Sequence, residues 1–325
     1  MIVQGNALHL PLAAGTVQCC VTSPPYWGLR DYGVPGQFGL EATPDLYVAS
    51  MVAVFREVRR VLKDDGVLFL NLGDSYAGSG PSGAFYQSET TKRRAEIQAD
   101  GNFRISKTLG ERGLTYAEKK PVAPPGLMPK DLVGIPWRVA FALQADGWWL
   151  RSDIIWAKPN PMPESVTDRP TKSHEYVFLL TKSARYYWDA EAVAEPSSKV
   201  GTVNSFGNKN ADARRVKSLT GNMKPGVKYE TKPTRNLRSV WTIATQPYPE
   251  AHFATMPEKL VEPCIKAGSK PGDLVLDPFA GSGTAGVVCR RFARRFVGVE
   301  LNPAYIDMAR RRLKGQLGMP MEASA

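Results

Sequence analysis

The sequence has few cysteines and few histidines. Its four cysteines, two of them adjacent at Cys19 and Cys20, show neither the pattern of a disulfide framework nor the spacing of metal ligands. The three histidines are scattered along the chain, so the sequence predicts no metal site. This cysteine usage is typical of a reducing compartment, and we expect a cytoplasmic protein.

Long apolar runs are absent as well. No run reaches the roughly 18–20 residues that a helix needs to cross a bilayer. The N-terminal stretch MIVQGNALHLPLAAG lacks the basic segment and the long apolar core of a signal peptide. We therefore expect no membrane among the partners. Hydrophobic residues still make up 43% of the chain, which is enough for a packed core and argues against wholesale disorder.

Acidic residues are scarce in one stretch. The formal net charge of the chain is +11. Between Pro196 and Arg238 there are ten basic residues and only two acidic ones, so this stretch carries eight of the eleven excess charges. Such a concentration favours an anionic partner, because Lys and Arg can neutralise the phosphates of a nucleic acid.

Short apolar runs alternate with amphipathic helical patterns, which predicts an α/β fold with a mostly parallel sheet and helices on both faces. Seven strands are expected, at Met1–Val3, Cys19–Thr22, Val67–Leu72, Arg151–Trp156, Tyr176–Thr181, Leu274–Asp277 and Phe296–Glu300. Five helices are expected, at Leu46–Leu62, Pro136–Asp146, Pro257–Ala267, Thr284–Phe292 and Pro303–Leu313. Residues 77–130 and 196–238 lack this rhythm, and loops of such length are expected to be functional or disordered.

A glycine-rich turn follows the apolar run Leu274–Leu276. It reads Asp277, Pro278, Phe279, Ala280, Gly281, Ser282, Gly283 and Thr284. A buried strand that runs through glycines into a helix lets the backbone approach a ligand closely. Glu300 comes nineteen residues after Gly281, the spacing at which an acidic side chain meets the ribose hydroxyls of a nucleotide-like cofactor. The glycine motif of nicotinamide-dependent enzymes is not preceded by Asp-Pro-Phe, so a nicotinamide oxidoreductase is the weaker alternative.

A second constellation, Thr22-Ser23-Pro24-Pro25-Tyr26-Trp27, follows the strand Val17–Val21. Two prolines fix φ and lack N–H donors, so the segment is rigid and its carbonyls remain acceptors. A hydroxyl before the prolines and an aromatic ring after them form a small slot. Acceptors at one end and a stacking face at the other suit a planar ring that bears an amino group.

These two motifs and their order resemble those of the amino-methylating DNA methyltransferases of the permuted (beta) type, in which the catalytic motif precedes the cofactor motif. The matching segments are Val3–Ala7, Thr22–Trp27, Arg60–Gly66, Ile154–Asn160, His252–Pro257 and Asp277–Thr284. The resemblance implies a Rossmann-like methyltransferase fold with a circularly permuted order. After Glu300 and the helix that follows it, only Gly315–Ala325 remain, too few for another strand and helix, so Met1–Val3 is expected to supply the outer strand of the cofactor half. The family has an acidic residue where this chain has Asn6.

The resemblance also implies roles. The expected catalytic residues are Ser23, Pro24, Pro25 and Tyr26. Ser23 and Pro24 would accept the protons of the substrate amine, and Tyr26 would stack on a base flipped out of the duplex. The cofactor is expected to be S-adenosylmethionine, bound by Asp277, Pro278, Phe279, Gly281, Ser282, Gly283, Thr284, Glu300, Asn302 and Thr255, with His252–Pro257 near its methionine end. Residues 1–195 would form the catalytic half, 196–240 a basic target-recognition insert and 241–325 the cofactor half. Residues expected to contact double-stranded DNA are Lys209, Arg214, Arg215, Lys217, Lys224, Lys228 and Arg235.

The target base remains open at this point. In the family, serine at the place of Ser23 goes mostly with cytosine and aspartate mostly with adenine, so N4 of cytosine is favoured and N6 of adenine is the alternative. A neutral hydroxyl could also donate to N3 of cytosine. Carbon-5 methylation needs a cysteine nucleophile. The pair Pro263-Cys264 lies inside the predicted amphipathic helix Pro257–Ala267, where Cys264 is expected to face the core, so we reject this mechanism. RNA, a protein amide and non-catalytic DNA binding are further alternatives, and a homodimer and a cognate restriction endonuclease are candidate partners.

Overall fold

The structure is a computed structural model. It describes residues 1–77, 123–124, 126–197, 200, 203–205, 228–230, 232–246 and 255–315. Most of the predicted insertion at 77–130 therefore lies outside the described residues. By its internal contacts the chain divides into two compact units, Met1–Tyr187 together with Ser239–Ala325, and Trp188–Arg238. Within the described ranges, no helix is both long and apolar enough to cross a membrane.

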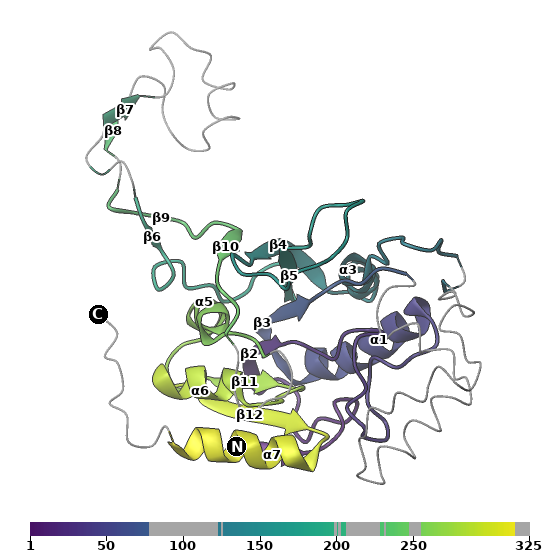
Figure 1. Cartoon of the computed structure of the whole chain (residues 1–325). Coiled ribbons are helices and arrows are strands. Elements are labelled where there is room, and N and C mark those ends of the chain that lie inside the picture. The colour runs from purple at the N-terminus through teal and green to yellow at the C-terminus, as the bar shows by residue number, and fades with distance from the viewer. Residues whose placement is uncertain are drawn as a thin grey trace, which may run out of the picture. The chain divides into compact units, whose positions relative to one another are not determined.

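The larger unit is built on one sheet, whose strands run in the order β1-β12-β11-β2-β3-β5-β4-β10 (Figure 1). The first five strands in this order are mutually parallel. Strand β5 is antiparallel to both of its neighbours, and β10 is parallel to β4. The strands are β1 (Ile2–Gln4), β2 (Val17–Thr22), β3 (Leu62–Leu72), β4 (Trp149–Ala157), β5 (His174–Thr181), β10 (Val240–Thr242), β11 (Leu274–Asp277) and β12 (Arg295–Glu300). The predicted mostly parallel α/β sheet is confirmed.

The sheet has one strand more than the seven predicted, namely β10. This strand pairs Val240 with Ile155 and Thr242 with Ala157 along the edge of β4. Only its central residue, Trp241, is buried. Three residues at the end of a basic, irregular segment show no readable periodicity, so the pattern could not reveal this edge strand.

Helices cover both faces of the sheet, as predicted. They are α1 (Pro44–Val61), α3 (Ile135–Ala145), α5 (Glu258–Gly268), α6 (Thr284–Arg291) and α7 (Pro303–Gly315). Alternation along the strands divides the core, because successive side chains point to opposite faces. Leu68 and Leu70 of β3 pack in the cluster that contains α1 and α3. Val67 and Phe69 instead lie against Gly268 of α5, where a Cβ would come within 3.1 Å of both side chains.

The order of the strands brings the two ends of the sequence together. Strand β1 pairs in parallel with β12, with Ile2 opposite Gly298. The N-terminal strand is therefore the outer strand of the sheet beside β12, as predicted. In the middle of the sheet β11 pairs with β2, with Leu276 opposite Cys20. Because these strands are parallel, the glycine turn and the Ser-Pro-Pro-Tyr segment leave the sheet at the same edge.

The smaller unit, Trp188–Arg238, contains two short antiparallel ladders among its described residues. Strand β6 (Glu195–Pro196) pairs with β9 (Thr234–Arg235), and β7 (Val203–Ser205) pairs with β8 (Lys228–Glu230). The carboxylate of Glu195 accepts hydrogen bonds from Arg235 Nε at 3.1 Å and Arg238 Nε at 2.8 Å. These ladders lie in the segment that the sequence predicts to be irregular.

Candidate active site

The catalytic and cofactor segments are joined directly where β2 and β11 end. Thr22 Oγ1, at the end of β2, donates to Asp277 Oδ1, at the end of β11, at 2.7 Å. Both residues are buried, with 0% and 2% of their surfaces exposed. Asp277 Oδ1 also accepts from the backbone N–H of Phe279 at 3.1 Å, which fixes the start of the turn. Ser23 and Pro278 therefore begin their loops from a common anchor.

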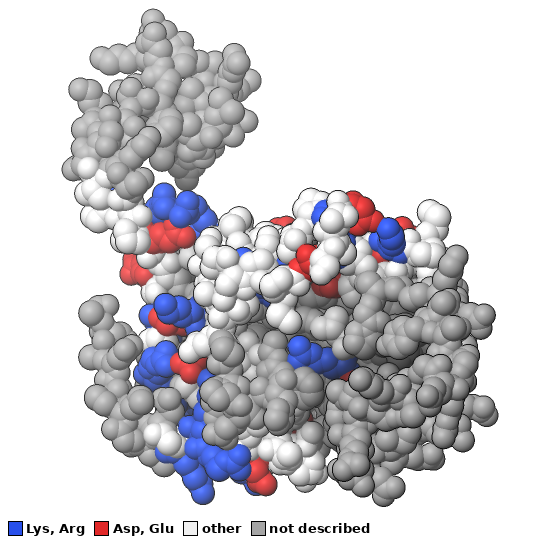
Figure 2. Space-filling model, in the orientation of Figure 1, with Lys and Arg blue, Asp and Glu red and all other residues white. Residues whose placement is uncertain are grey.

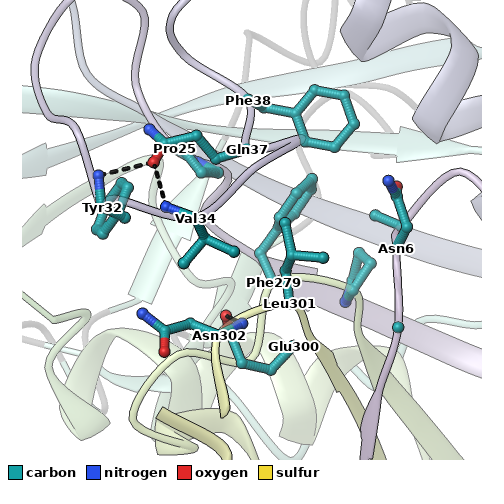
Figure 3. Close-up of a pocket in the computed structure, with 13 residues that line it drawn as sticks. Asn6, Pro25, Tyr32, Val34, Gln37, Phe38, Phe279, Glu300, Leu301 and Asn302 are labelled. Atoms are coloured by element: carbon teal, nitrogen blue, oxygen red, sulfur yellow. Dashed lines mark hydrogen bonds between the residues drawn. The ribbon is translucent and has the colours of Figure 1, made fainter. Parts of the chain in front are cut away.

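A hollow lies beside this anchor at the ends of the strands (Figure 3). The space inside it, counting the solvent at its open side, is about 430 Å³. Four stretches of chain form its walls: the segment after β1, the loop after β2, the glycine turn, and the end of β12. The lining residues are Gly5, Asn6, Ala7, Pro25, Tyr32, Val34, Gln37, Phe38, Pro278, Phe279, Glu300, Leu301 and Asn302.

The polar side of the hollow is formed by Glu300 and Asn302. Glu300 Oε2 accepts from the N–H of Gly281 at 2.8 Å, and its Oε1 accepts from the N–H of Asn302 at 2.9 Å. Burial raises the pKa of this carboxyl above its ordinary value. A fixed carboxylate with acceptor capacity to spare suits the two hydroxyls of a ribose. Asn302 Oδ1 accepts from the N–H of Ala304, so it also caps the first turn of α7.

The apolar side of the hollow is formed largely by aromatic rings. Phe38 and Phe279 meet edge to face, with centroids 5.8 Å apart. Gln37 shapes the adjoining wall, because its Oε1 accepts from the N–H groups of Tyr32 at 2.8 Å and Val34 at 3.5 Å (Figure 3). Aromatic rings on one side and ribose acceptors on the other fit the adenosine part of S-adenosylmethionine.

Four predicted cofactor residues line this hollow: Pro278, Phe279, Glu300 and Asn302. Six others, Asp277, Gly281, Ser282, Gly283, Thr284 and Thr255, are not among its lining residues. The side chains of Ser282 and Thr284 both accept hydrogen bonds from Arg312 Nη1 of α7, at 3.2 and 2.9 Å. These two side chains therefore attach the turn to a helix, which leaves the backbone of the turn as the part that can face a ligand.

The glycines of the turn have backbone reasons to be glycine. Gly281 and Gly283 have φ values of 48° and 76°, in the left-handed region that other residues rarely adopt. A Cβ on Gly283 would also lie 3.1 Å from Cβ of Ala309 on α7. Asn6, the departure from the family pattern, lines the hollow while its Oδ1 accepts from the N–H of Leu8 at 3.0 Å.

The Ser-Pro-Pro-Tyr segment is held rigidly next to the hollow. Tyr47 Oη on α1 donates to the Pro25 carbonyl at 2.9 Å. The hydroxyls of Ser23 and Tyr26 lie 3.3 Å apart. The Tyr26 ring packs directly on Gly73, because a Cβ there would come within 2.5 Å of ring carbon Cε2. The Tyr26 ring is thus held closely against the backbone at Gly73.

Sequence reasoning missed several residues around this site. The wall formed by Tyr32, Val34, Gln37 and Phe38 was not predicted, although Gly33, Gly36 and Gly39, all with positive φ, mark the segment as a tight loop. The polar residues Asn71, Lys158 and Glu175 around Tyr26 were not assigned either. Glu175 has one usable signal, since it is a carboxylate next to the apolar run Val177–Leu180 of its strand.

Most predicted DNA contacts cannot be placed. Lys209, Arg214, Arg215, Lys217 and Lys224 lie outside the described residues. Lys228 begins β8, and Arg235 lies in β9, where it is exposed and ion-paired with Glu195. Figure 2 shows basic and acidic side chains side by side over β6 and β9.

Cys264, the alternative nucleophile, lies in α5 away from the lining of the hollow. It is 2% exposed, and burial raises the pKa of its thiol well above the ordinary value. A buried neutral thiol is a poor nucleophile. This supports the rejection of carbon-5 chemistry.

The fold is similar to those of solved DNA methyltransferases. The fold matches PvuII DNA methyltransferase (cytosine-N4-specific), with a TM-score of 0.60, 17% identity and coverage of 99% of this chain and 87% of that one. It also matches TTHA0409 of Thermus thermophilus complexed with S-adenosylmethionine, with a TM-score of 0.56, 20% identity and coverage of 98% and 94%. The fold is therefore that of the Rossmann-like methyltransferases.

Sequence comparison is more specific. A family model described as DNA methylase, for N6 and N4 enzymes, matches residues 17–311. The type II methyltransferase M.Cfr9I of Citrobacter freundii is 47% identical over 317 residues, covering 97% of this chain and 88% of the relative. M.SmaI of Serratia marcescens is 46% identical over 295 residues, covering 91% and 83%. The chain belongs to this family of type II, S-adenosylmethionine-dependent amino-methylating DNA methyltransferases.

The buried Asp277 predicts a pH effect on stability. Burial raises the pKa of this carboxyl to about 7, against the opposing effect of its hydrogen bonds. An aspartate in an unfolded chain titrates near pH ~3.9. Between about pH 4 and 7 the folded protein thus binds the additional proton, and this group makes stability fall as the pH rises through that window. Asp277→Asn removes the titration, so we expect the variant's Tm to decline less than the wild type's between about pH 5 and 7.

The measurement is thermal unfolding of the cofactor-free protein over this pH range. Asp64→Asn is the matched control, because the Asp64 side chain is 97% exposed, and it should keep the wild-type slope. A constant difference in Tm between wild type and Asp277→Asn at every pH would contradict the prediction.

Proposed function

We propose that the protein methylates the N4 amino group of cytosine in double-stranded DNA after flipping the base out of the helix. The observation that carries the proposal is the position of the Ser23 hydroxyl. Ser23 is the first residue of the rigid segment after β2, beside the hollow that we assign to adenosine. Pro25 belongs to this segment and also lines the hollow, so the slot and the hollow are adjacent.

The chemistry follows from the weakness of the nucleophile. The lone pair of an exocyclic amine is delocalised into the ring, and it becomes available when the amine protons are held by acceptors. Ser23 Oγ and the Pro24 carbonyl supply these acceptors, and the Tyr26 ring holds the base between its face and the opposite wall. When bound, S-adenosylmethionine would supply an electrophilic methyl group: the N–CH₃ bond forms as the S–CH₃ bond breaks, S-adenosylhomocysteine is the leaving group, and the proton lost by the nitrogen passes to solvent. Fixing both reactants in one geometry makes the transfer effectively unimolecular, which supplies much of the rate.

Cytosine is favoured by the identity of Ser23, since serine at this place resembles the cytosine enzymes. The PvuII enzyme that shares the fold is named as cytosine-N4-specific. Methylation of N6 of adenine would use the same residues in the same roles, and it is the second candidate.

DNA recognition is proposed for the basic insert at residues 196–240, between a catalytic half (1–195) and a cofactor half (241–325). Ten of its residues are Lys or Arg, a composition that suits phosphate contacts. The type II relatives support a place in a restriction–modification pair, with a cognate endonuclease that cuts the same unmethylated site. A homodimer on DNA is the assembly proposed.

The experiment is to incubate the purified protein with unmethylated genomic DNA and methyl-labelled S-adenosylmethionine, digest the DNA to nucleosides and separate them by mass. We expect the label in N4-methylcytosine. Label in N6-methyladenine would keep the mechanism and change the base. No label in any nucleoside, with cofactor binding shown by calorimetry, would refute DNA as the substrate and redirect the search to RNA or a protein amide.

A further inference from the structure

A partly buried ion pair lies next to the catalytic slot. Glu175, the second residue of β5, pairs with Lys158, the residue after β4, and their side chains are 15% and 16% exposed. Lys158 Nζ also lies 4.3 Å from the centre of the Trp156 ring. Burying two charges is costly even when they are paired. The value of this pair therefore depends on what else the carboxylate contacts.

The carboxylate binds the catalytic tyrosine. Glu175 Oε2 lies 2.7 Å from Tyr26 Oη and accepts from Asn71 Nδ2 at 3.1 Å. Tyr26 Oη also lies 3.1 Å from Asn71 Oδ1. A tyrosine hydroxyl has a single proton, and an ionised carboxylate at the shorter distance is the stronger acceptor. The Tyr26 proton is therefore donated to Glu175.

This assignment fixes the orientation of the next hydroxyl. Once its own proton is committed to Glu175, the Tyr26 oxygen can only accept from Ser23 Oγ, 3.3 Å away. The Ser23 proton then points inward to Tyr26, and the lone pairs of Ser23 are left for the substrate. The hydroxyls form a chain with one direction, from Ser23 to Tyr26 to Glu175, and Lys158 compensates the charge at its end.

We propose that Glu175 is a positioning residue that orients Ser23, through Tyr26, as an acceptor toward the amino group of the flipped base. The inference rests on the proposed methylation of an amine at Ser23. A serine hydroxyl can otherwise rotate and either donate or accept. Donation toward the amine would oppose attack, because it would compete for the nitrogen lone pair. In this arrangement Ser23 does not donate to N3 of cytosine, so a donor to N3 must come from another group.

A double-mutant cycle tests the chain. Tyr26→Phe keeps the ring and removes the hydroxyl, and Glu175→Gln keeps the shape and removes the carboxylate. We expect each single variant to lower kcat about tenfold, as for one lost hydrogen bond in the transition state, with the KM for DNA and cofactor affinity unchanged. The double variant should be no slower than Tyr26→Phe, because Glu175 acts through a hydroxyl that is no longer present.

Two controls accompany the cycle. Glu262→Gln removes a carboxylate that is ion-paired with Lys266 on α5, and it should keep the wild-type kcat. If Glu175→Gln does not fold because Lys158 has lost its charge partner, Glu175→Gln combined with Lys158→Met repeats the cycle without an unpaired lysine.

The outcomes separate this inference from the proposed function. Multiplying effects in the double variant, or a Glu175→Gln enzyme with wild-type kcat, would overturn the role of Glu175 while the active wild type still upholds amine methylation. A wild type that labels adenine leaves the cycle fully readable on that product. A wild type that labels no base would refute the proposed function and this inference with it.

Discussion

Ser23→Ala is expected to lower kcat about 10²-fold or more while cofactor affinity stays within a factor of two or so of the wild type. The variant removes one of the two acceptors assigned to the amine protons, and removal of one preorganised polar group from a transition state typically costs a factor of this size. The hollow should be unaffected, since Ser23 is not among the residues that line it. Initial rates with methyl-labelled cofactor give kcat, and calorimetric titration gives the cofactor affinity.

A matched control separates this effect from a general loss of structure. Ser50→Ala removes a hydroxyl from α1, a helix position outside the slot, and should leave kcat unchanged. An undiminished kcat in Ser23→Ala would remove this hydroxyl from the mechanism. A large loss of cofactor affinity would instead show that the slot and the hollow are not separable.

Glu300→Ala should weaken cofactor binding about 10–100-fold. Hydrogen bonds to a charged group contribute roughly 1.5–3 kcal/mol each, and this carboxylate faces the hollow where ribose hydroxyls would lie. Its loss also releases the N–H groups of Gly281 and Asn302, which hold the turn and the start of α7. At saturating cofactor, kcat should recover substantially, because Glu300 does not contact the amine-binding slot in this arrangement.

Calorimetry with S-adenosylmethionine measures the affinity. Asp307→Ala on α7 is the control, since it removes an exposed carboxylate one turn after the same loop and should bind cofactor as the wild type does. Unchanged affinity in Glu300→Ala would end the assignment of this residue to the ribose.

The sequence was most informative where one local pattern sufficed. The strand–turn–helix from Leu274 to Arg291 and the role of β1 as an outer strand followed from apolar runs, glycines and chain length. The proposed sites depend also on contacts between residues that are far apart in the sequence. The contact of Tyr26 with Glu175 joins residues 149 positions apart, and it arises from the antiparallel register of β3, β4 and β5. This register depends on pairing between distant segments, so it cannot be predicted from the composition of any one of them.

The wall of the hollow shows a different limit. Gln37 and Phe38 sit in a loop without periodicity, and their positions are set by side chain to backbone bonds within the loop and by contact with Phe279. The eighth strand was missed for a related reason, because β10 is only three residues long and only Trp241 is buried. The structure of short irregular segments is fixed by the residues against which they pack, and a local sequence pattern does not predict those contacts.

The interleaving of the two ends of the chain has a consequence for how the protein is made. During synthesis β1 and β2 emerge from the ribosome well before β12 and β11, with which they pair in the sheet. Pairing between Ile2 and Gly298 closes a loop of about 300 residues, and such non-local pairing slows folding. Until residue 300 has been released, two apolar strands have exposed edges open to wrong partners. We therefore expect nascent chains truncated before β11 to require chaperones to stay unaggregated.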